Sequence, residues 1–191
     1  MLLSRDILAP WFERGQPYET FVAGADLMHQ QAWHQRHGVL ELNAEQLSVV
    51  GRFERKMGIL CLTGRWCGDC ALQGAALGRI AQASNGLIDL RFVERSEDTA
   101  ELVVASMVNA GTRVPVTWLL AEDGAPAARF GDRTLSRYRS MARKALGPDS
   151  NVHAEAPADP VRTVLQEVLD EVERVQWLLR LSTRLRQRHG D

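Results

Sequence analysis

The fold of this chain is decided by one stretch of sequence, Gly58-Ile59-Leu60-Cys61-Leu62-Thr63-Gly64-Arg65-Trp66-Cys67-Gly68-Asp69-Cys70. Its opening residues, up to Thr63, form a short and continuous apolar run, which is typical of a strand buried on both faces. Gly64 ends that run, and from Cys67 to about Ala83 the apolar residues recur at helical spacing. The pair of cysteines therefore lies on the turn that leads from a buried strand into a helix.

Two cysteines have a chemical use at such a turn. Cys67 stands at the helix N-terminus, where unpaired backbone N–H groups and the helix dipole stabilise a thiolate and lower its pKa. The thiolate is the form that attacks disulfides. Cys70 lies one turn further on the same side, where it can resolve a mixed disulfide. We therefore expect a redox-active Cys67–Cys70 disulfide that works without a bound cofactor, with Cys67 as the nucleophile.

Two other interpretations stay open at this point. The same cysteine spacing occurs in zinc sites, so the pair could hold a metal ion or an iron–sulfur cluster, even one that bridges two chains. A zinc ribbon needs a second ligand pair, and Cys61 is the only further cysteine in the sequence, so we expect no metal. The chain could also be a binding or adaptor module with little redox turnover.

Residues beyond the cysteines alternate between strand and helix patterns. We expect strands over 87–93, 114–120 and 127–131, with the last two joined as a hairpin by the turn at 122–124, and helices over 98–107 and 135–146. In the first of these helices, Asp98 and Glu101 resemble a capping box. Alternating units followed by a hairpin predict an α/β fold with a mixed central sheet and helices on both faces.

The whole chain is expected to form one domain with two helical additions. Residues 1–55 are a helical extension that includes a helix from the capping box at Asn43 and Gln46; residues 56–146 are the core; residues 147–159 are a linker; and residues 160–191 hold one long C-terminal helix. The apolar residues of the last helix recur at alternating four- and three-residue steps: Val161, Leu165, Val168, Val172, Val175 and Leu179. We expect this seam to pack on the chain's own N-terminal helices, with a homodimer through the C-terminal helix as the alternative.

Charge and composition limit the partners and the compartment. The chain has 23 basic and 24 acidic residues, a net charge of −1 that gives no reason to expect nucleic acid or a membrane surface as partner. Residues 1–10 contain Arg5, Asp6 and Pro10, which do not form the apolar core of a secretory signal. Together with the low cysteine content, this predicts a reducing, cytoplasmic setting.

Several of these residues resemble motifs of the thioredoxin superfamily, and most closely those of a bacterial thioredoxin-like group with a WCGDC motif. The matching segments are 59–63, Trp66 to Cys70, Arg113-Val114-Pro115 and Gly131, and the resemblance covers about 56–146. It implies a thioredoxin-like fold and a thiol–disulfide oxidoreductase. The implied activity is reduction of protein or small-molecule disulfides, with an unknown electron donor.

The resemblance also implies roles for residues around the cysteines. The Val114–Pro115 peptide bond is expected to be cis and to face the cysteine pair, so that the backbone of Val114 can pair with an extended substrate. Trp66 is expected to shield the site. With Arg113, these residues form the expected substrate-binding surface.

Two positions depart from the family pattern. Asp69 stands between the cysteines where relatives have proline, and Cys61 stands where they have a buried acid that assists proton transfer. Asp69 or water would then take over the proton transfer, while Cys61 is expected to be a small buried apolar residue. Arg65 and Arg113 are expected to flank the sulfurs and to offset the charge of Asp69.

Three histidines lie in a polar helical stretch. His29, Trp33 and His37 follow each other at four-residue intervals and therefore share one helix face. Because a metal site needs more convergent ligands than these, we expect a solvated surface face.

The charge of Asp69 predicts the redox poise of the pair. An ionised carboxylate beside Cys67 disfavours its thiolate, so the reduced form is less stabilised and the protein gives electrons more readily. Replacing Asp69 with Asn should therefore lower the pKa of Cys67 and raise the reduction potential of the pair. A thiol titration and a redox titration of the variant and the parent check this, and no change in either quantity would contradict it.

Overall fold

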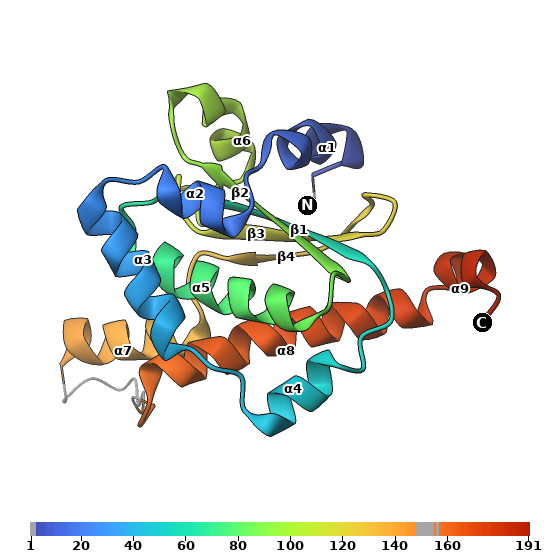
Figure 1. Ribbon diagram of the computed structural model, residues 1–191. Coiled ribbons are helices and arrows are strands. Elements are labelled where there is room, and N and C mark those ends of the chain that lie inside the picture. Colours follow the sequence, from blue (N-terminus) through green and yellow to red (C-terminus); the bar gives the residue numbers. More distant parts are fainter. Residues whose placement is uncertain (1–2, 148–154, 156) are drawn as a thin grey trace.

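The computed structural model describes residues 3–147, 155 and 157–191 (Figure 1). Its strands, in chain order, are β1 (Met57–Thr63), β2 (Ile88–Glu94), β3 (Val116–Ala121) and β4 (Pro126–Gly131). The helices before β1 are α1 (Arg5–Arg14), α2 (Tyr18–Ala23), α3 (Leu27–Val39) and α4 (Ala44–Val50). Those after it are α5 (Gly68–Ala83), the 3-10 turn η1 (Glu97–Thr99), α6 (Ala100–Ala105), α7 (Leu135–Leu146), α8 (Pro160–Leu181) and α9 (Thr183–His189).

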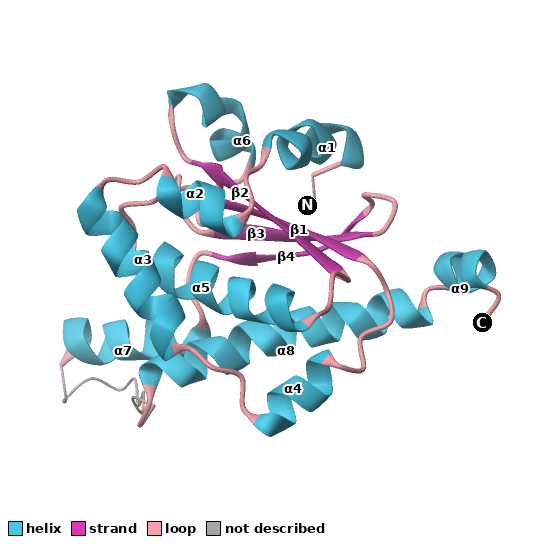
Figure 2. Ribbon diagram, viewed as in Figure 1, coloured by secondary structure: helices cyan, strands magenta, loops and turns pink. Residues whose placement is uncertain are grey.

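The strands form one mixed sheet in the order β2-β1-β3-β4 (Figure 2). β1 pairs in parallel with β2 and antiparallel with β3, and β3 pairs antiparallel with β4. β1 lies inside the sheet and is almost wholly buried, as its continuous apolar run predicts. Helices α5 and α8 cross one face of the sheet, and α1 and α6 lie on the other side (Figure 1). The expected α/β sheet with helices on both faces is confirmed.

The helix predicted over 135–146 is present as α7, but α8 is the helix that packs on the sheet near it. In α7 only Ser136 is buried, and this helix packs on α8 rather than on the sheet. Helix α8 lies against α5, β3, β4 and α4, and its buried side chains include the predicted seam from Leu165 to Leu179. The seam is thus covered within the chain, mainly by α5 and the sheet, and of the expected N-terminal helices α4 contributes a smaller part. Glu167 of α8 fixes the start of α7, since its carboxylate accepts from the Ser136 N–H at 2.8 Å and from the Ser136 hydroxyl at 2.6 Å.

The N-terminal extension is part of the same core. The backbone of Gln16 pairs with Phe92 at the free edge of β2, with N–O distances of 2.8 and 2.9 Å. Trp33 of α3 is fully buried, and its ring lies directly over Gly74 of α5. The expectation of a solvated surface face around Trp33 is therefore wrong, because Trp33 packs in an aromatic cluster with Tyr18, Phe21 and Phe92. The hydrophobicity of this single residue outweighs the polar pattern of its helix.

Most predicted boundaries hold within a few residues. The capping box at Asn43 is present, but its helix ends at Val50. The predicted capping box at Asp98 and Glu101 is wrong: Ser96 and Thr99 form it instead.

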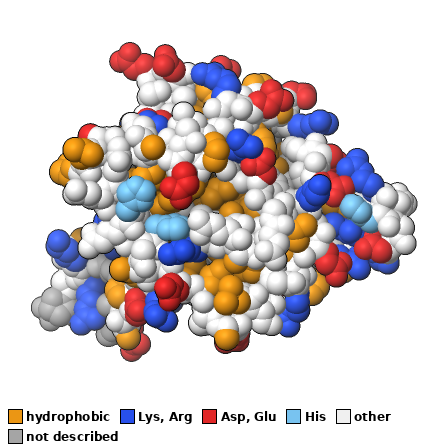
Figure 3. Space-filling model, viewed as in Figure 1, with side chains coloured by type: hydrophobic (Ala, Val, Ile, Leu, Met, Phe, Trp, Pro, Cys, Tyr) orange, Lys and Arg blue, Asp and Glu red, His pale blue; other side chains and the backbone are white. Residues whose placement is uncertain are grey.

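The C-terminal region differs more from the prediction. The long C-terminal helix breaks at Ser182 into α8 and α9. The predicted linker over 147–159 lies largely outside the described residues. No helix within the described part of the chain is both long and apolar enough to cross a bilayer, and Figure 3 shows charged side chains of both signs spread over the face in view.

The packing of Trp33 on α5 can be tested with two glycines. A Cβ at Gly74 would lie 2.8 Å from Cη2 of Trp33, so Gly74→Ala should destabilise the fold by roughly 1–3 kcal/mol through overpacking. Gly38 in α3 has open space around it, so Gly38→Ala should leave stability unchanged or raise it by up to about 1 kcal/mol. Denaturant unfolding of both variants checks this. Equal effects of the two substitutions would show that α3 is not tightly packed on α5.

Candidate active site

Cys67 is the N-cap residue of α5. Its sulfur accepts a hydrogen bond from the backbone N–H of Cys70 at 3.3 Å. A side-chain acceptor at this position satisfies one of the free N–H groups at the helix start. Cys67 is partly exposed, whereas Cys70 is buried and its sulfur accepts from the N–H of Gly64 at 3.4 Å. All three cysteines of the chain are free thiols in this structure.

The surroundings of the two sulfurs separate their acidities. The thiol of Cys70 donates to the sulfur of Cys67, and together with the backbone N–H groups of Cys70 and Asp69 this lowers the pKa of Cys67 to about 7. Burial and the Asp69 charge oppose that shift without cancelling it. Burial, and then the neighbouring Cys67, hold the pKa of Cys70 far above its ordinary value. Near neutral pH, therefore, about half of Cys67 is thiolate, while Cys70 stays a thiol.

The Val114–Pro115 segment faces this pair. The peptide bond between these residues is cis, as predicted. The carbonyl oxygen of Val114 lies 3.9 Å from the sulfur of Cys67. Gly131, at the end of β4, packs against the backbone of Pro115, and a Cβ there would lie 3.1 Å from Cα of Val116. Glycine is required at this position because backbone fills the space that a side chain would need.

Asp69 is buried and bound by two arginines that the sequence did not indicate. One carboxylate oxygen accepts from Nε of Arg133 at 2.7 Å and the other from Nε of Arg137 at 2.6 Å. Arg65, expected to offset the Asp69 charge, instead pairs with Glu94 and donates to the carbonyl of Phe21 at 2.8 Å. The expectation for Arg65 is therefore wrong, because α2 and β2 offer it closer acceptors.

Arg113 belongs to the same polar network but does not touch the sulfurs. Its guanidinium lies 3.2 Å from the carboxylate of Asp132, which is 1% exposed. Arg133 contacts the same carboxylate at 3.0 Å, and the hydroxyl of Tyr138 donates to it. The only signal in the sequence for this network was the four-residue spacing of Arg133 and Arg137 at the start of a helix, which does not reveal their acceptor.

Cys61 is buried, as predicted, and the hydroxyls of Thr63 and Thr117 lie beside it. Cys61 lies opposite Thr117 across the β1–β3 pair, and the Thr117 hydroxyl donates to its sulfur at 3.5 Å. The hydroxyl of Thr63 shares this strand face and is fully buried. Burial raises the pKa of Cys61 to about 12, so this thiol stays protonated near neutral pH. The described polar side chains that contact Cys61 thus include hydroxyls but no carboxylate.

The loop before Cys67 is braced by the N-terminal extension. The indole N–H of Trp33 donates to the carbonyl of Arg65 at 2.9 Å. Trp66 lies over Gly64 and is 55% exposed, with the guanidinium of Arg95 6.0 Å from its ring centroid. The indole of Trp66 therefore covers the loop and presents an apolar surface beside the cysteine pair.

Among the described residues, no group of three His, Cys, Asp or Glu side chains is arranged to hold a metal ion. His29 of the predicted histidine face is bound to Asp26 at 2.7 Å, and Asp26 also caps α3. These contacts do not arrange the histidines of α3 as ligands of one metal ion.

The acidity of Cys67 predicts the pH dependence of its alkylation. Because the pKa is lowered to about 7 from an ordinary value of 9, the rate of iodoacetamide labelling at Cys67 should rise to half its maximum near pH 7. Cys61 and Cys70 should label much more slowly, since both are buried with raised pKa values. Mass spectrometry of the reduced protein at several pH values measures this. A midpoint near pH 9, or first labelling at Cys61 or Cys70, would contradict it.

Comparison with known proteins agrees with this fold. The chain is similar to a structure of a protein of unknown function from Pseudomonas aeruginosa, at 20% identity and a TM-score of 0.67, over 91% of this chain and 97% of that one. It is also similar to an HIV epitope scaffold, at 18% identity and a TM-score of 0.65, over 87% of this chain and 95% of that one. At these identities the likeness shows the fold alone.

No curated protein matches the sequence. The family model described as thioredoxin matches residues 15–144, more than half of the chain, and the chain therefore belongs to this thioredoxin family.

Proposed function

We propose that this protein is a thiol–disulfide oxidoreductase that reduces disulfides of proteins or small molecules in the cytoplasm. One observation carries the proposal: the sulfur of the partly exposed Cys67 caps α5 and accepts from the buried Cys70 residue, which lowers the pKa of Cys67 to about 7. An exposed low-pKa thiolate next to a buried thiol is the arrangement that disulfide exchange needs.

The reaction has two exchange steps. The Cys67 thiolate attacks one sulfur of the substrate disulfide, forms a mixed disulfide, and releases the other substrate sulfur as a thiolate that takes a proton from water. The sulfur of Cys70 then loses its proton and attacks the sulfur of Cys67. This step forms the Cys67–Cys70 disulfide and releases the second substrate thiol. The substrate gains two electrons, the cysteine pair loses two, and a dithiol electron donor restores the pair.

The proton on Cys70 has few internal acceptors. Both oxygens of the Asp69 carboxylate already accept from guanidinium groups. The thiol of Cys61 is protonated, because its pKa is raised to about 12. We propose that water entering beside the mixed disulfide takes this proton, which makes the second step slower than it would be with a buried carboxylate.

The Cys67 pKa also supports a reducing role. Strong disulfide oxidants of this kind lower their attacking thiol to roughly pKa 3.5, which stabilises the reduced form much more than a pKa near 7 does. The charge of Asp69 acts in the same sense, since it opposes the thiolate of Cys67. The weaker stabilisation of the thiolate favours transfer of electrons from the pair to a substrate.

Serine variants test the proposed function. The assay measures how fast the protein reduces a protein disulfide, such as that of insulin, with dithiothreitol as the electron donor. Cys67→Ser should abolish this activity. Cys70→Ser should lose turnover by at least about 100-fold but accumulate a mixed disulfide through Cys67, visible as added mass. Cys61→Ser serves as the matched control, because the buried Cys61 takes no part in exchange and should keep most of the activity. Full activity of Cys67→Ser would overturn the proposal.

A further inference from the structure

The rim of the cysteine site is positively charged. Arg113, Arg133 and Arg137 bind two carboxylates, those of Asp69 and Asp132, and the carboxylates are 8% and 1% exposed. The three arginine side chains are 41%, 25% and 34% exposed. The negative ends of these pairs are therefore buried and the positive ends face the solvent, with one positive charge in excess.

A fourth arginine reaches the rim from the N-terminal extension. The guanidinium of Arg36 in α3 would lie 3.7 Å from a Cβ at Gly68, which is the first residue of α5. Arg36 is held there by a 2.8 Å hydrogen bond to the carbonyl of Ala32. Arg36, Arg133 and Arg137 thus approach the same helix N-terminus. Arg113 joins them indirectly, through the carboxylate of Asp132 that it shares with Arg133.

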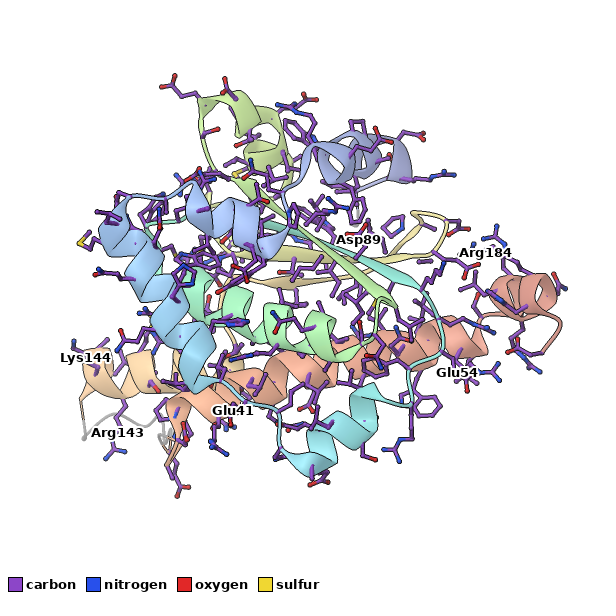
Figure 4. All side chains as sticks on the ribbon, in the orientation of Figure 1. Glu41, Glu54, Asp89, Arg143, Lys144 and Arg184 are labelled. Carbon is purple, nitrogen blue, oxygen red and sulfur yellow. The ribbon has the colours of Figure 1, made fainter. Side chains whose placement is uncertain are left out.

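Helix α7 continues this charge away from the site. The segment from Arg133 to Gly147 contains no acidic residue and five basic ones. Three of these, Arg139, Arg143 and Lys144, are exposed, and the last two extend outward from α7 in Figure 4.

Apolar side chains lie among these charges. At three-residue steps, Leu135, Tyr138 and Met141 are 58%, 41% and 42% exposed. Because only Ser136 of α7 is buried, most of the helix surface is left uncovered by the part of the chain that the structure describes. The net charge of the chain is −1, so this basic surface is a local feature and does not reflect the protein as a whole.

We propose that this surface, which we call the α7 rim, docks an acidic segment of a disulfide-bearing protein and so selects acidic substrates for Cys67. The inference rests on the proposed function. Clustered positive charge attracts an acidic partner and speeds encounter, and the exposed apolar side chains between the charges add contact area that a small acidic thiol would leave unused. The contacts that hold Arg113, Arg133 and Arg137 are made before any partner arrives, so little ordering is needed on binding.

Two peptides of matched sequence test the selection. Each has a central cysteine activated as a mixed disulfide with thionitrobenzoate, flanked on both sides by several glutamates in one peptide and by lysines in the other. Release of the coloured thiol by the full-length reduced protein gives the rate of attack by Cys67, and division by the rate with mercaptoethanol removes differences in peptide reactivity. The acidic peptide should react about 10-fold faster than the basic one at low salt, and high salt should remove most of this difference.

Charge reversal locates the effect. The triple variant Arg139→Glu, Arg143→Glu, Lys144→Glu should lose the preference for the acidic peptide, while a neutral peptide should react at the parental rate. The neutral peptide shows that Cys67 and the fold are intact.

A matched control variant reverses three positive charges on a surface away from α7. The triple variant Arg52→Glu, Lys56→Glu, Arg174→Glu changes exposed residues before β1 and on α8, so it should keep the preference. Equal rates for the acidic and basic peptides in the parent, or an equal loss in both triple variants, would overturn the inference. Binding of the parent to anionic vesicles or nucleic acid through the same three α7 residues, without any peptide preference, would also overturn it. No release from any peptide would instead contradict the proposed function.

Discussion

The structure depends on the interaction between the sulfur of Cys67 and the start of α5. The helix start has free N–H groups and a partial positive charge, and the Cys67 sulfur is placed to accept from them. This requires α5 to begin just after the carboxyl end of β1, beyond the short loop 64–67, and the buried, continuous run of β1 fixes that end inside the sheet. Position and chemistry are therefore set together: the packing of β1 and α5 determines where the thiolate lies and why it is stabilised.

The polar groups around the start of α5 differ between the protein interior and its surface. On the inner side, Cys61 and Thr117 contribute a thiol and a hydroxyl but no carboxylate, and both are buried, as predicted for Cys61. On the outer side, the charge of Asp69 is taken by Arg133 and Arg137. The carboxylate inside the cysteine motif is therefore tied to α7 and links the site to a largely exposed helix. The pKa of Cys67 is still set mainly by the Cys70 thiol and the helix start, and the charge of Asp69 only opposes that shift.

The N-terminal extension supports the site mechanically. Trp33 fills the space over Gly74 and donates to the carbonyl of Arg65, so one side chain joins α3, α5 and the loop before Cys67. A residue that the polar pattern of α3 placed at the surface is thus one of the largest buried side chains of the protein. Local periodicity failed here because the burial of one large indole can hold a helix against the core even where most of its other residues are polar.

The sequence by itself determined the order of strands and helices, the place of Cys67 and Cys70 at a strand–helix turn, and the family to which these motifs belong. These features follow from local periodicity and from motifs of a few residues, which depend little on distant parts of the chain. Only the tertiary structure decided that α8 and not α7 covers the sheet, that Arg65 turns toward Glu94, and that Asp69 is bound by Arg133 and Arg137. Each of these depends on which of several arginines or apolar faces comes within a few ångströms of its partner. Residues 64 and 68 positions apart in sequence form the contacts of Asp69, and charge and amphipathic spacing alone cannot choose among equivalent candidates at such separations.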